Sequence, residues 1–189
     1  MKTQKTVTIH ACCAVCLGHP HNLLRELGYD IEVLFYNPNI YPLKEYEQRK
    51  SEVIRFCQDT KTKLTIIEDE PSVYYEFVEG LEGEPEKGLR CERCFQLRLN
   101  KTAETAKLHK SDYFTTTLSV SPHKSFAQIR LAAESAAKEF DVPYLEFNFK
   151  KQNGFKLTNE IAQKYNFYRQ NYCGCEFSIK KDLVEAQNS

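Results

Sequence analysis

The fold is decided by Val7-Thr-Ile-His10, a run of mainly β-branched residues that leads directly into Ala11-Cys-Cys-Ala-Val-Cys16. β-Branched residues favour strands, so the run predicts a short buried strand that carries a cysteine-bearing loop at its carboxyl end. A helical pattern follows at 21–27, and Gly28 is placed to close it. A strand, a loop and a helix in this order are typical of the first unit of an α/β fold.

The same alternation continues along the chain. It predicts further strands at 31–36, 64–67, 113–117 and 143–149, and further helices at 43–59, 91–109, 125–140 and about 153–166. This order favours a three-layer α/β fold with a mainly parallel sheet and helices on both faces. We find no internal repeat or linker in the sequence, and residues 1–189 are therefore predicted to form a single domain. Because ligands bind beyond the carboxyl ends of parallel strands, we expect Cys12–Cys16 and Ser119–Lys124 to border one crevice.

The composition is typical of a globular protein of the cytosol. The chain is 41% hydrophobic and 28% charged, with a formal net charge of zero, which argues against a strongly basic, non-specific nucleic-acid binder. The sequence has no run of about 18 apolar residues, and its first ten residues lack the apolar run of a secretory signal. We therefore expect a cytoplasmic protein without a membrane partner. In that reducing compartment eight cysteines point to metal binding or catalysis.

The zero net charge hides an asymmetry. Residues 67–92 contain nine acidic and two basic side chains, whereas residues 150–181 contain seven basic and two acidic ones. Two solvated faces of opposite sign explain this pattern. A polyanion bound against the C-terminal third explains it equally well.

Seven of the eight cysteines occur in three short clusters, of which Cys91-Glu-Arg-Cys94 begins a predicted helix. Residues three apart share a helix face, and a helix start beside arginines lowers thiol pKa values. A thioredoxin-like redox pair, a zinc half-site, an iron–sulfur half-site and two buried thiols all fit this spacing. Added to Cys12 and Cys13, the pair gives four thiolates, the number that a 4Fe–4S cluster or a structural zinc requires.

Other spacings narrow these alternatives. Adjacent cysteines such as Cys12 and Cys13 are a poor pair of ligands for a structural zinc, which prefers two cysteines spaced a few residues apart. A radical S-adenosylmethionine loop is disfavoured because His19 stands where its third cysteine is needed. Cys16 is left for a second metal or for the substrate. Cys173-Gly-Cys175 forms a strained, labile disulfide if oxidised, which suits a redox-active pair, or else supplies two further ligands.

Single candidates outside the clusters have mainly structural interpretations. Cys57 is predicted to be a core residue. His10 is either a ligand or donor beside Cys12 or a buried histidine with its hydrogen bonds satisfied. Asp112 is more typical of a structural role than of a metal ligand.

Five segments together resemble one known family, the QueH-type epoxyqueuosine reductases. They are His10-Ala-Cys-Cys-Ala-Val-Cys16, Tyr36-Asn-Pro-Asn-Ile40, Arg90-Cys-Glu-Arg-Cys-Phe95, Thr115-Thr-Thr-Leu-Ser-Val-Ser-Pro122 and Tyr168-Arg-Gln-Asn-Tyr-Cys-Gly-Cys-Glu-Phe-Ser178. The resemblance runs from about residue 7 to 178.

The resemblance implies a cobalamin-independent, iron–sulfur oxidoreductase on a nucleotide-hydrolase-like (HUP) fold. Its substrate is a tRNA with epoxyqueuosine at the wobble position, whose epoxide is reduced by two electrons to give queuosine and water. The resemblance also implies an external electron donor, a 4Fe–4S cluster and an adjacent mononuclear iron. Carried over by motif, Cys12, Cys13, Cys91 and Cys94 hold the cluster, Cys16 shares in the second iron, and Cys173 and Cys175 form the redox-active pair.

The basic C-terminal part, about residues 150–181, suits contacts to tRNA. Phosphate contacts and base stacking require cations interleaved with aromatic rings. The candidates are Lys150, Lys151, Lys156, Arg169 and Tyr172.

Three alternatives stay open. An ATP-dependent RNA-thiolating or adenylating enzyme needs a glycine-bearing phosphate loop, which Ala11–Cys16 does not provide. The others are an iron–sulfur electron-transfer protein and a zinc-stabilised RNA-binding module.

Overall fold

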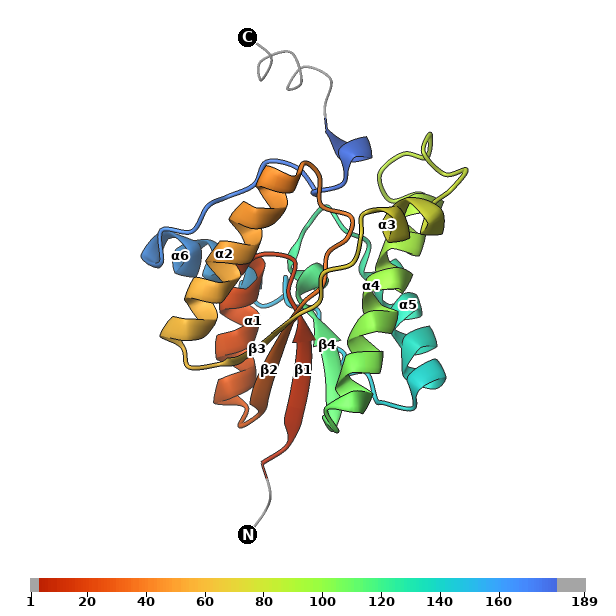
Figure 1. Cartoon of the computed structure of the whole chain (residues 1–189). Coiled ribbons are helices and arrows are strands. Elements are labelled where there is room, and N and C mark those ends of the chain that lie inside the picture. The colour runs from red at the N-terminus through yellow and green to blue at the C-terminus, as the bar shows by residue number, and fades with distance from the viewer. Residues whose placement is uncertain (1–3, 180–189) are drawn as a thin grey trace.

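The computed structural model describes residues 4–179. Four parallel strands form one sheet in the order β3-β2-β1-β4 (Figure 1). The strands are β1 (Thr6–His10), β2 (Asp30–Phe35), β3 (Lys63–Ile66) and β4 (Tyr113–Thr116). The predicted parallel α/β architecture is therefore confirmed.

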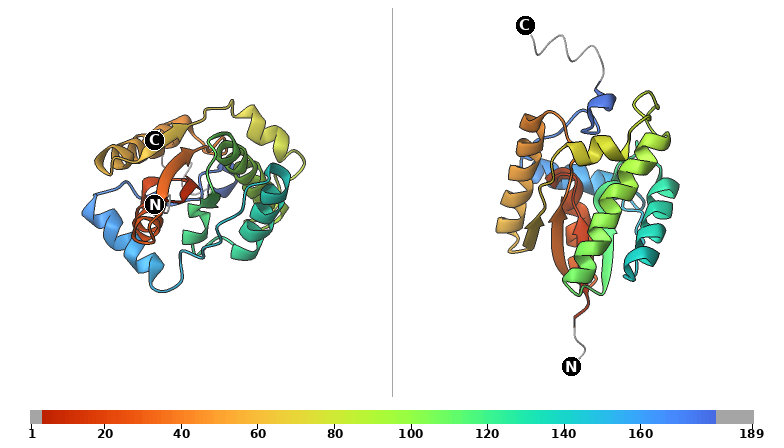
Figure 2. Two further views of the ribbon diagram at one scale, coloured as in Figure 1. Left: turned by 90° about the horizontal axis from the view of Figure 1, so that it is seen from below. Right: turned by 45° about the vertical axis from the view of Figure 1, so that its right-hand side comes forward.

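Helices cover both faces of this sheet (Figure 2). They are α1 (Ala14–Glu26), α2 (Leu43–Asp59), α3 (Ser72–Phe77), α4 (Leu89–Leu108), α5 (Phe126–Phe140) and α6 (Gly154–Lys164), with 3-10 turns η1 (Thr117–Val120) and η2 (Glu176–Ser178). Helices α1, α2 and α6 lie on one side, and α4 and α5 pack together on the other. In the described residues no helix is long and apolar enough to cross a membrane.

The strand order changes direction beside β1. The chain first runs outward from β1 to β2 and β3, then returns past them to place β4 on the other side of β1. In open parallel sheets this switch creates a crevice at the carboxyl ends of the two strands. Residues 11–16 follow β1 and residues 117–124 follow β4, so both loops border that crevice.

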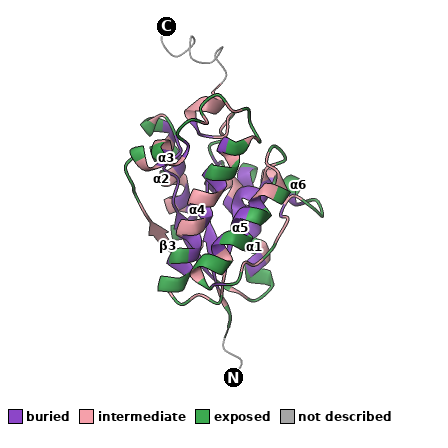
Figure 3. Cartoon of the chain, turned by 90° about the vertical axis from the view of Figure 1, so that its right-hand side faces the viewer, coloured by how far each residue is buried: buried purple, intermediate pink, exposed green. Residues whose placement is uncertain are grey.

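The core lies on both faces of β1, and the purple helix faces in Figure 3 mark it. Val7 and Ile9 are fully buried and pack with Leu17 of α1 in one cluster of side chains. Phe114 of β4 packs with Leu99 of α4 in a second cluster. The opposite face of β1 carries Thr8 and His10, which are also fully buried, and their polar atoms lie within hydrogen-bond distance of Ser111 and Thr116. Both faces of this central strand are therefore covered.

Helix α1 begins at Ala14, seven positions before the predicted start at 21. Gly18 and Pro20 disfavour a helix locally, but the tertiary structure favours one. The Cys13 side chain caps the helix by accepting a hydrogen bond from the Cys16 amide. Gly18 admits close packing of α6, since a Cβ there would lie 2.6 Å from Cγ2 of Ile161. The structure therefore places Cys16 on the first turn of a helix.

The predicted strand at 143–149 is wrong. Only Tyr144 forms a bridge to the sheet, with Phe114. Beyond this bridge, side chains take the hydrogen bonds that a neighbouring strand would otherwise make. Thr115 donates to the Leu145 carbonyl at 2.8 Å, and Ser119 donates to the Phe147 carbonyl at 2.8 Å. Because the Leu145 and Phe147 carbonyls bond to side chains, residues 143–149 do not continue as a strand of the sheet.

Two smaller predictions about the segment before β4 need correction. Helix α4 begins at Leu89 rather than at 91, so Cys91 lies in its first turn and Cys94 in its second. The short helix α3 lies in the acidic stretch, where no helix was predicted.

Candidate functional site

Three thiols gather where β1 meets α1. The Sγ atoms of Cys12, Cys13 and Cys16 all lie within 4.8 Å of one another. Cys12 and Cys13 are buried and Cys16 is half-buried. The extended backbone of Cys13, with φ −171° and ψ 164°, allows the vicinal pair to direct both sulfurs to one point.

These three thiols share protons. Thiol hydrogen bonds from Cys13 and Cys16 hold the pKa of Cys12 well below its usual value. The bond to Cys12 raises the pKa of Cys13 to about 12, and the pKa of Cys16 is also raised. The hydroxyl of Thr117 accepts from the Cys12 amide at 3.3 Å and lies 3.6 Å from its sulfur. The three thiols therefore favour a single thiolate. Thiolates are preferred ligands of soft metal ions, so this group is suited to bind one.

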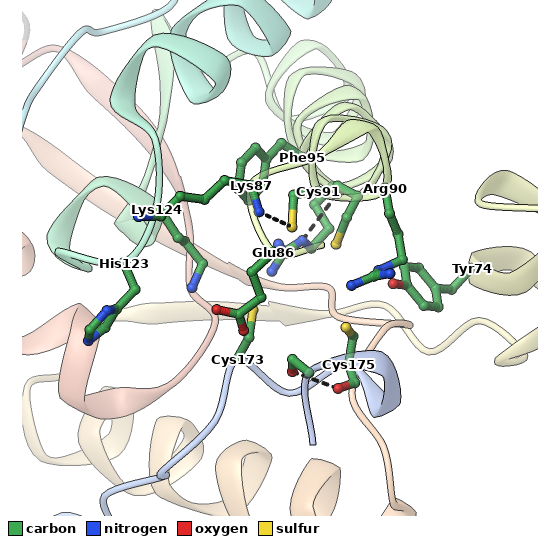
Figure 4. Close-up of a pocket in the computed structure, with 13 residues that line it drawn as sticks. Tyr74, Glu86, Lys87, Arg90, Cys91, Phe95, His123, Lys124, Cys173 and Cys175 are labelled. Carbon is green, nitrogen blue, oxygen red and sulfur yellow. Dashed lines mark hydrogen bonds between the residues drawn. The ribbon is translucent and has the colours of Figure 1, made fainter. Parts of the chain in front are cut away.

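Four more thiols surround a small cavity of about 40 Å³ (Figure 4). It lies between α4 and residues 172–178, which we call the C-terminal segment. Cys91 and Cys94 reach the cavity from α4, and Cys173 and Cys175 point toward them from the other side. Burial raises the pKa of Cys91, and it raises the pKa of Cys94 to about 12. Without a cation these groups therefore stay protonated.

The C-terminal segment is held in place by α2. Arg49 donates to the carbonyl of Cys173 at 3.1 Å and to that of Tyr172 at 3.3 Å. The amide of Tyr41 donates to the Gly174 carbonyl at 2.8 Å. Gly174 has φ +115°, and a Cβ there would lie 2.9 Å from Nη1 of Arg49. Glycine is thus required for the turn that aims Cys173 and Cys175 at α4.

The two groups of thiols adjoin. A larger cavity of about 660 Å³ is bordered by Cys12, Cys16 and Cys173, and Cys173 and Lys124 border both cavities. Cys91 packs against the cluster of side chains that contains Cys12. Seven cysteines from three distant segments therefore meet at the carboxyl edge of the sheet.

Cations accompany the sulfur atoms. The arginines at the start of α4 were predicted to favour thiolates, whereas Lys124 was not predicted from the sequence. Arg98 is 2% exposed, its Nη2 has no hydrogen-bond partner within residues 4–179, and neighbouring thiols raise its pKa further. Lys124 points into the small cavity (Figure 4). An unpaired buried cation is costly, so the arrangement suits an anionic group in the cavity. The only signal in the sequence was the arginine-rich start of α4.

The three candidates outside the cysteine clusters, His10, Asp112 and Cys57, have structural roles. Both ring nitrogens of His10 lie 3.1 Å from partners, the Thr116 hydroxyl and the Tyr36 carbonyl. Burial lowers the pKa of His10 to about 4, so it is a neutral core residue. Asp112 accepts from the amide and hydroxyl of Thr6. Cys57 is buried in the core.

The predicted tRNA contacts separate into two groups. Arg169 and Tyr172 border the larger cavity. The Lys150 amine donates to the Lys124 carbonyl at 3.3 Å. Lys151 and Lys156 are exposed outside the cavity.

Solved structures share this fold at 13% sequence identity. The U34-tRNA thiolase NcsA from Methanococcus maripaludis, solved with its [4Fe-4S] cluster, matches with a TM-score of 0.62 over 99% of this chain and 65% of that one. A predicted subunit of a tRNA methyltransferase from Methanocaldococcus jannaschii gives 0.57 over 82% and 75%. These similarities support the expected nucleotide-hydrolase-like fold class.

Sequence comparisons are more specific. The family model for "Epoxyqueuosine reductase QueH" matches residues 7–181. Proteins with that description are 38% identical in Haemophilus influenzae, covering 91% of this chain and 71% of the relative, and 37% in Streptococcus pyogenes, covering 96% and 74%. The Thermotoga maritima protein is 34% identical over 92% and 90%. The chain therefore belongs to the QueH family of epoxyqueuosine reductases.

Proposed function

We propose that this chain reduces the epoxide of epoxyqueuosine at the wobble position of tRNA and so forms queuosine. The reaction adds two electrons and two protons, breaks both carbon–oxygen bonds of the epoxide and releases water. The observation that carries the proposal is the convergence of seven cysteines beside an open cavity in a chain of this family. Such a site places electron-donating sulfur atoms beside a cavity that can hold a substrate.

An iron–sulfur group fits the residues that are present. Four thiolates hold a 4Fe–4S cluster, and we assign them to Cys12, Cys13, Cys91 and Cys94, with Cys16 as a ligand of an adjacent iron. Support comes from the donor set and from Arg98, whose buried Nη2 has no hydrogen-bond partner within residues 4–179 and whose positive charge matches the negative charge of thiolate ligands. When bound, iron in this site supplies single electrons and a Lewis acid for the epoxide oxygen.

Cys173 and Cys175 are assigned as the redox-active pair. Their two thiols release two electrons and two protons when they form a disulfide, which balances the loss of one oxygen as water. An external electron donor then restores the dithiol. The hydrogen bonds from Arg49 to the C-terminal segment, which we call the Arg49 clamp, support this role. They hold the backbone so that both sulfur atoms point toward α4.

A second allocation of ligands has its own support. Cys91, Cys94, Cys173 and Cys175 all border one small cavity, and four thiolates there also satisfy the count for a cluster. Under this allocation the Cys12–Cys16 group holds the second iron. Colour retention in a Cys173 variant distinguishes the two allocations.

The tRNA is proposed to approach from the side of α6. Arg169 and Tyr172 border the larger cavity, and the exposed amines of Lys151 and Lys156 lie on the same basic segment. Lys150 is assigned to this basic segment as well. Cations of this kind contact phosphates, and an aromatic ring stacks on an unpaired base.

The test is anaerobic incubation of the iron-loaded protein with epoxyqueuosine-containing tRNA and dithionite, followed by mass analysis of the nucleosides. We expect loss of one oxygen atom from the modified nucleoside. The matched control is Cys57→Ala, which removes a buried thiol outside the clusters and should stay active. A colourless protein that binds only zinc and leaves the nucleoside unchanged refutes the proposal.

A further inference from the structure

The larger cavity has the dimensions of a small-molecule site. Its volume of about 660 Å³ lies within the range of 300–1,000 Å³ that is typical of ligand pockets. Cys12, Cys16 and Cys173 border one part of it, and Phe155, Thr158 and Asn159 of α6 border another. A single nucleoside fits this space, whereas a folded RNA does not.

Two polar side chains of its wall have unused hydrogen-bonding atoms. Thr158 is 2% exposed, and its hydroxyl has no partner within residues 4–179. Gln170 donates from Nε2 to the Cys13 sulfur at 2.9 Å, while its Oε1 is buried without a partner in that same range. Buried polar atoms are nearly always paired, and each unpaired one costs about 1–3 kcal/mol. Both side chains border this cavity, so a polar ligand bound there can supply the missing hydrogen-bond partners.

The rim supplies an apolar surface and a cation. Phe155 is 43% exposed although it lies beside the cavity. Arg169 donates to Oδ1 of Asn159 at 2.7 Å, which fixes its guanidinium at the same rim. An exposed aromatic ring beside an oriented cation is a common surface for a nucleotide.

We infer that this cavity is the subsite for the modified wobble nucleoside. Phe155 stacks on the base, Thr158 and Gln170 hydrogen-bond to polar groups of the nucleoside, and Arg169 contacts the adjacent phosphate. The reacting ring then faces Cys16 and Cys173. This inference rests on the proposed function and adds the residues that recognise the substrate.

Thr158→Val tests the inference because it exchanges a hydroxyl for a methyl group of similar size. Loss of one hydrogen bond should raise KM for epoxyqueuosine-containing tRNA about 3- to 10-fold, with kcat and the visible spectrum unchanged. The thermal midpoint should stay equal or rise, because the variant no longer buries an unpaired hydroxyl. A purely structural hydroxyl predicts the reverse, a lower midpoint with an unchanged KM, and that result overturns the inference.

Phe155→Leu provides a second variant that keeps an apolar side chain but removes the stacking ring. It should weaken binding of the modified tRNA at least 5-fold. Leu157→Ala is the matched control, since Leu157 is 38% exposed on the same helix outside the cavity. Equal losses in Phe155→Leu and Leu157→Ala contradict the inference.

Filter binding separates this inference from the proposed function. The probes are tRNA with epoxyqueuosine and an otherwise identical transcript with guanosine at the wobble position. The wild type should prefer the modified tRNA, and Thr158→Val should reduce that preference. If the wild type prefers the modified tRNA without converting it, the function fails and the subsite stands. If it converts the nucleoside and both variants bind like the wild type, the subsite fails and the function stands.

Discussion

Arg49 provides the sharpest test of how the fold holds the Cys173–Cys175 segment. It forms an ion pair at 2.7 Å with Glu45, and the two side chains are only 2% and 9% exposed. The same guanidinium donates to the carbonyls of Tyr172 and Cys173. Arg49→Met therefore removes the clamp and leaves a buried carboxylate whose remaining side-chain partner within residues 4–179 is the Tyr168 hydroxyl at 2.8 Å.

The expected loss follows from these contacts. Removing one partner of a buried ion pair costs about 3–5 kcal/mol. Each charged hydrogen bond adds about 1.5–3 kcal/mol in isolation, but all of them share one guanidinium and do not add. We expect the free energy of unfolding to fall by about 3–5 kcal/mol and the thermal midpoint by about 6–20 °C.

Urea unfolding of the metal-free protein measures this loss. The control is Arg130→Met, because Arg130 and Glu134 form another pair four residues apart, at 3.7 Å, with both side chains 48% exposed. That variant should lose less than about 1 kcal/mol. Glu45→Gln added to Arg49→Met should recover part of the stability, since a buried amide costs less than an unpaired carboxylate.

The functional readout is independent of the stability. At a temperature where Arg49→Met stays folded, reduction of the modified tRNA should fall sharply while the visible absorption persists, because the clamp positions the redox-active pair. A loss below 1 kcal/mol, or no recovery on adding Glu45→Gln, refutes the argument from the buried pair.

Three further predictions concern other parts of the molecule. Cys91→Ala should bleach the iron-loaded protein and abolish turnover, whereas Cys173→Ala should keep the visible colour and lose multiple turnover. Bleaching in Cys173→Ala would make Cys173 a ligand. Burial lowers the pKa of His21, so the unfolded chain binds the proton preferentially below about pH 6.5 and stability is lost as the pH falls. Urea midpoints at pH 7.5 and 5.5 should differ less in His21→Gln than in the wild type, and equal differences contradict this. Gly18→Ala should lower the free energy of unfolding by about 1–3 kcal/mol through its 2.6 Å approach to Ile161, and a stabilised variant disproves the packing argument.

The sequence was sufficient to predict the parallel α/β alternation and the end of the sheet at which the chemistry lies. Strands and helices follow from residue patterns over a few positions, and the carboxyl ends of parallel strands meet at one edge. The loops after Val7–His10 and Tyr113–Thr116 were therefore predicted to be neighbours, as they are in the structure. Cys12, Cys13 and Cys16 in the first loop, and Cys91 and Cys94 at the start of α4, were candidates for the same reason.

Tertiary structure decided the features that depend on distant segments. A helix through Gly18 and Pro20 forms because α6 packs closely against it, and the predicted strand at 143–149 is lost because side chains from β4 and η1 take its hydrogen bonds. The sequence showed arginines at the start of α4, but it did not show that Arg98 is buried with Nη2 unpaired or that the Thr158 hydroxyl lacks a partner, as both do within residues 4–179. A side chain becomes buried, and a polar atom loses its partner, only when segments far apart in the chain pack together and exclude water. Local sequence patterns do not predict this packing.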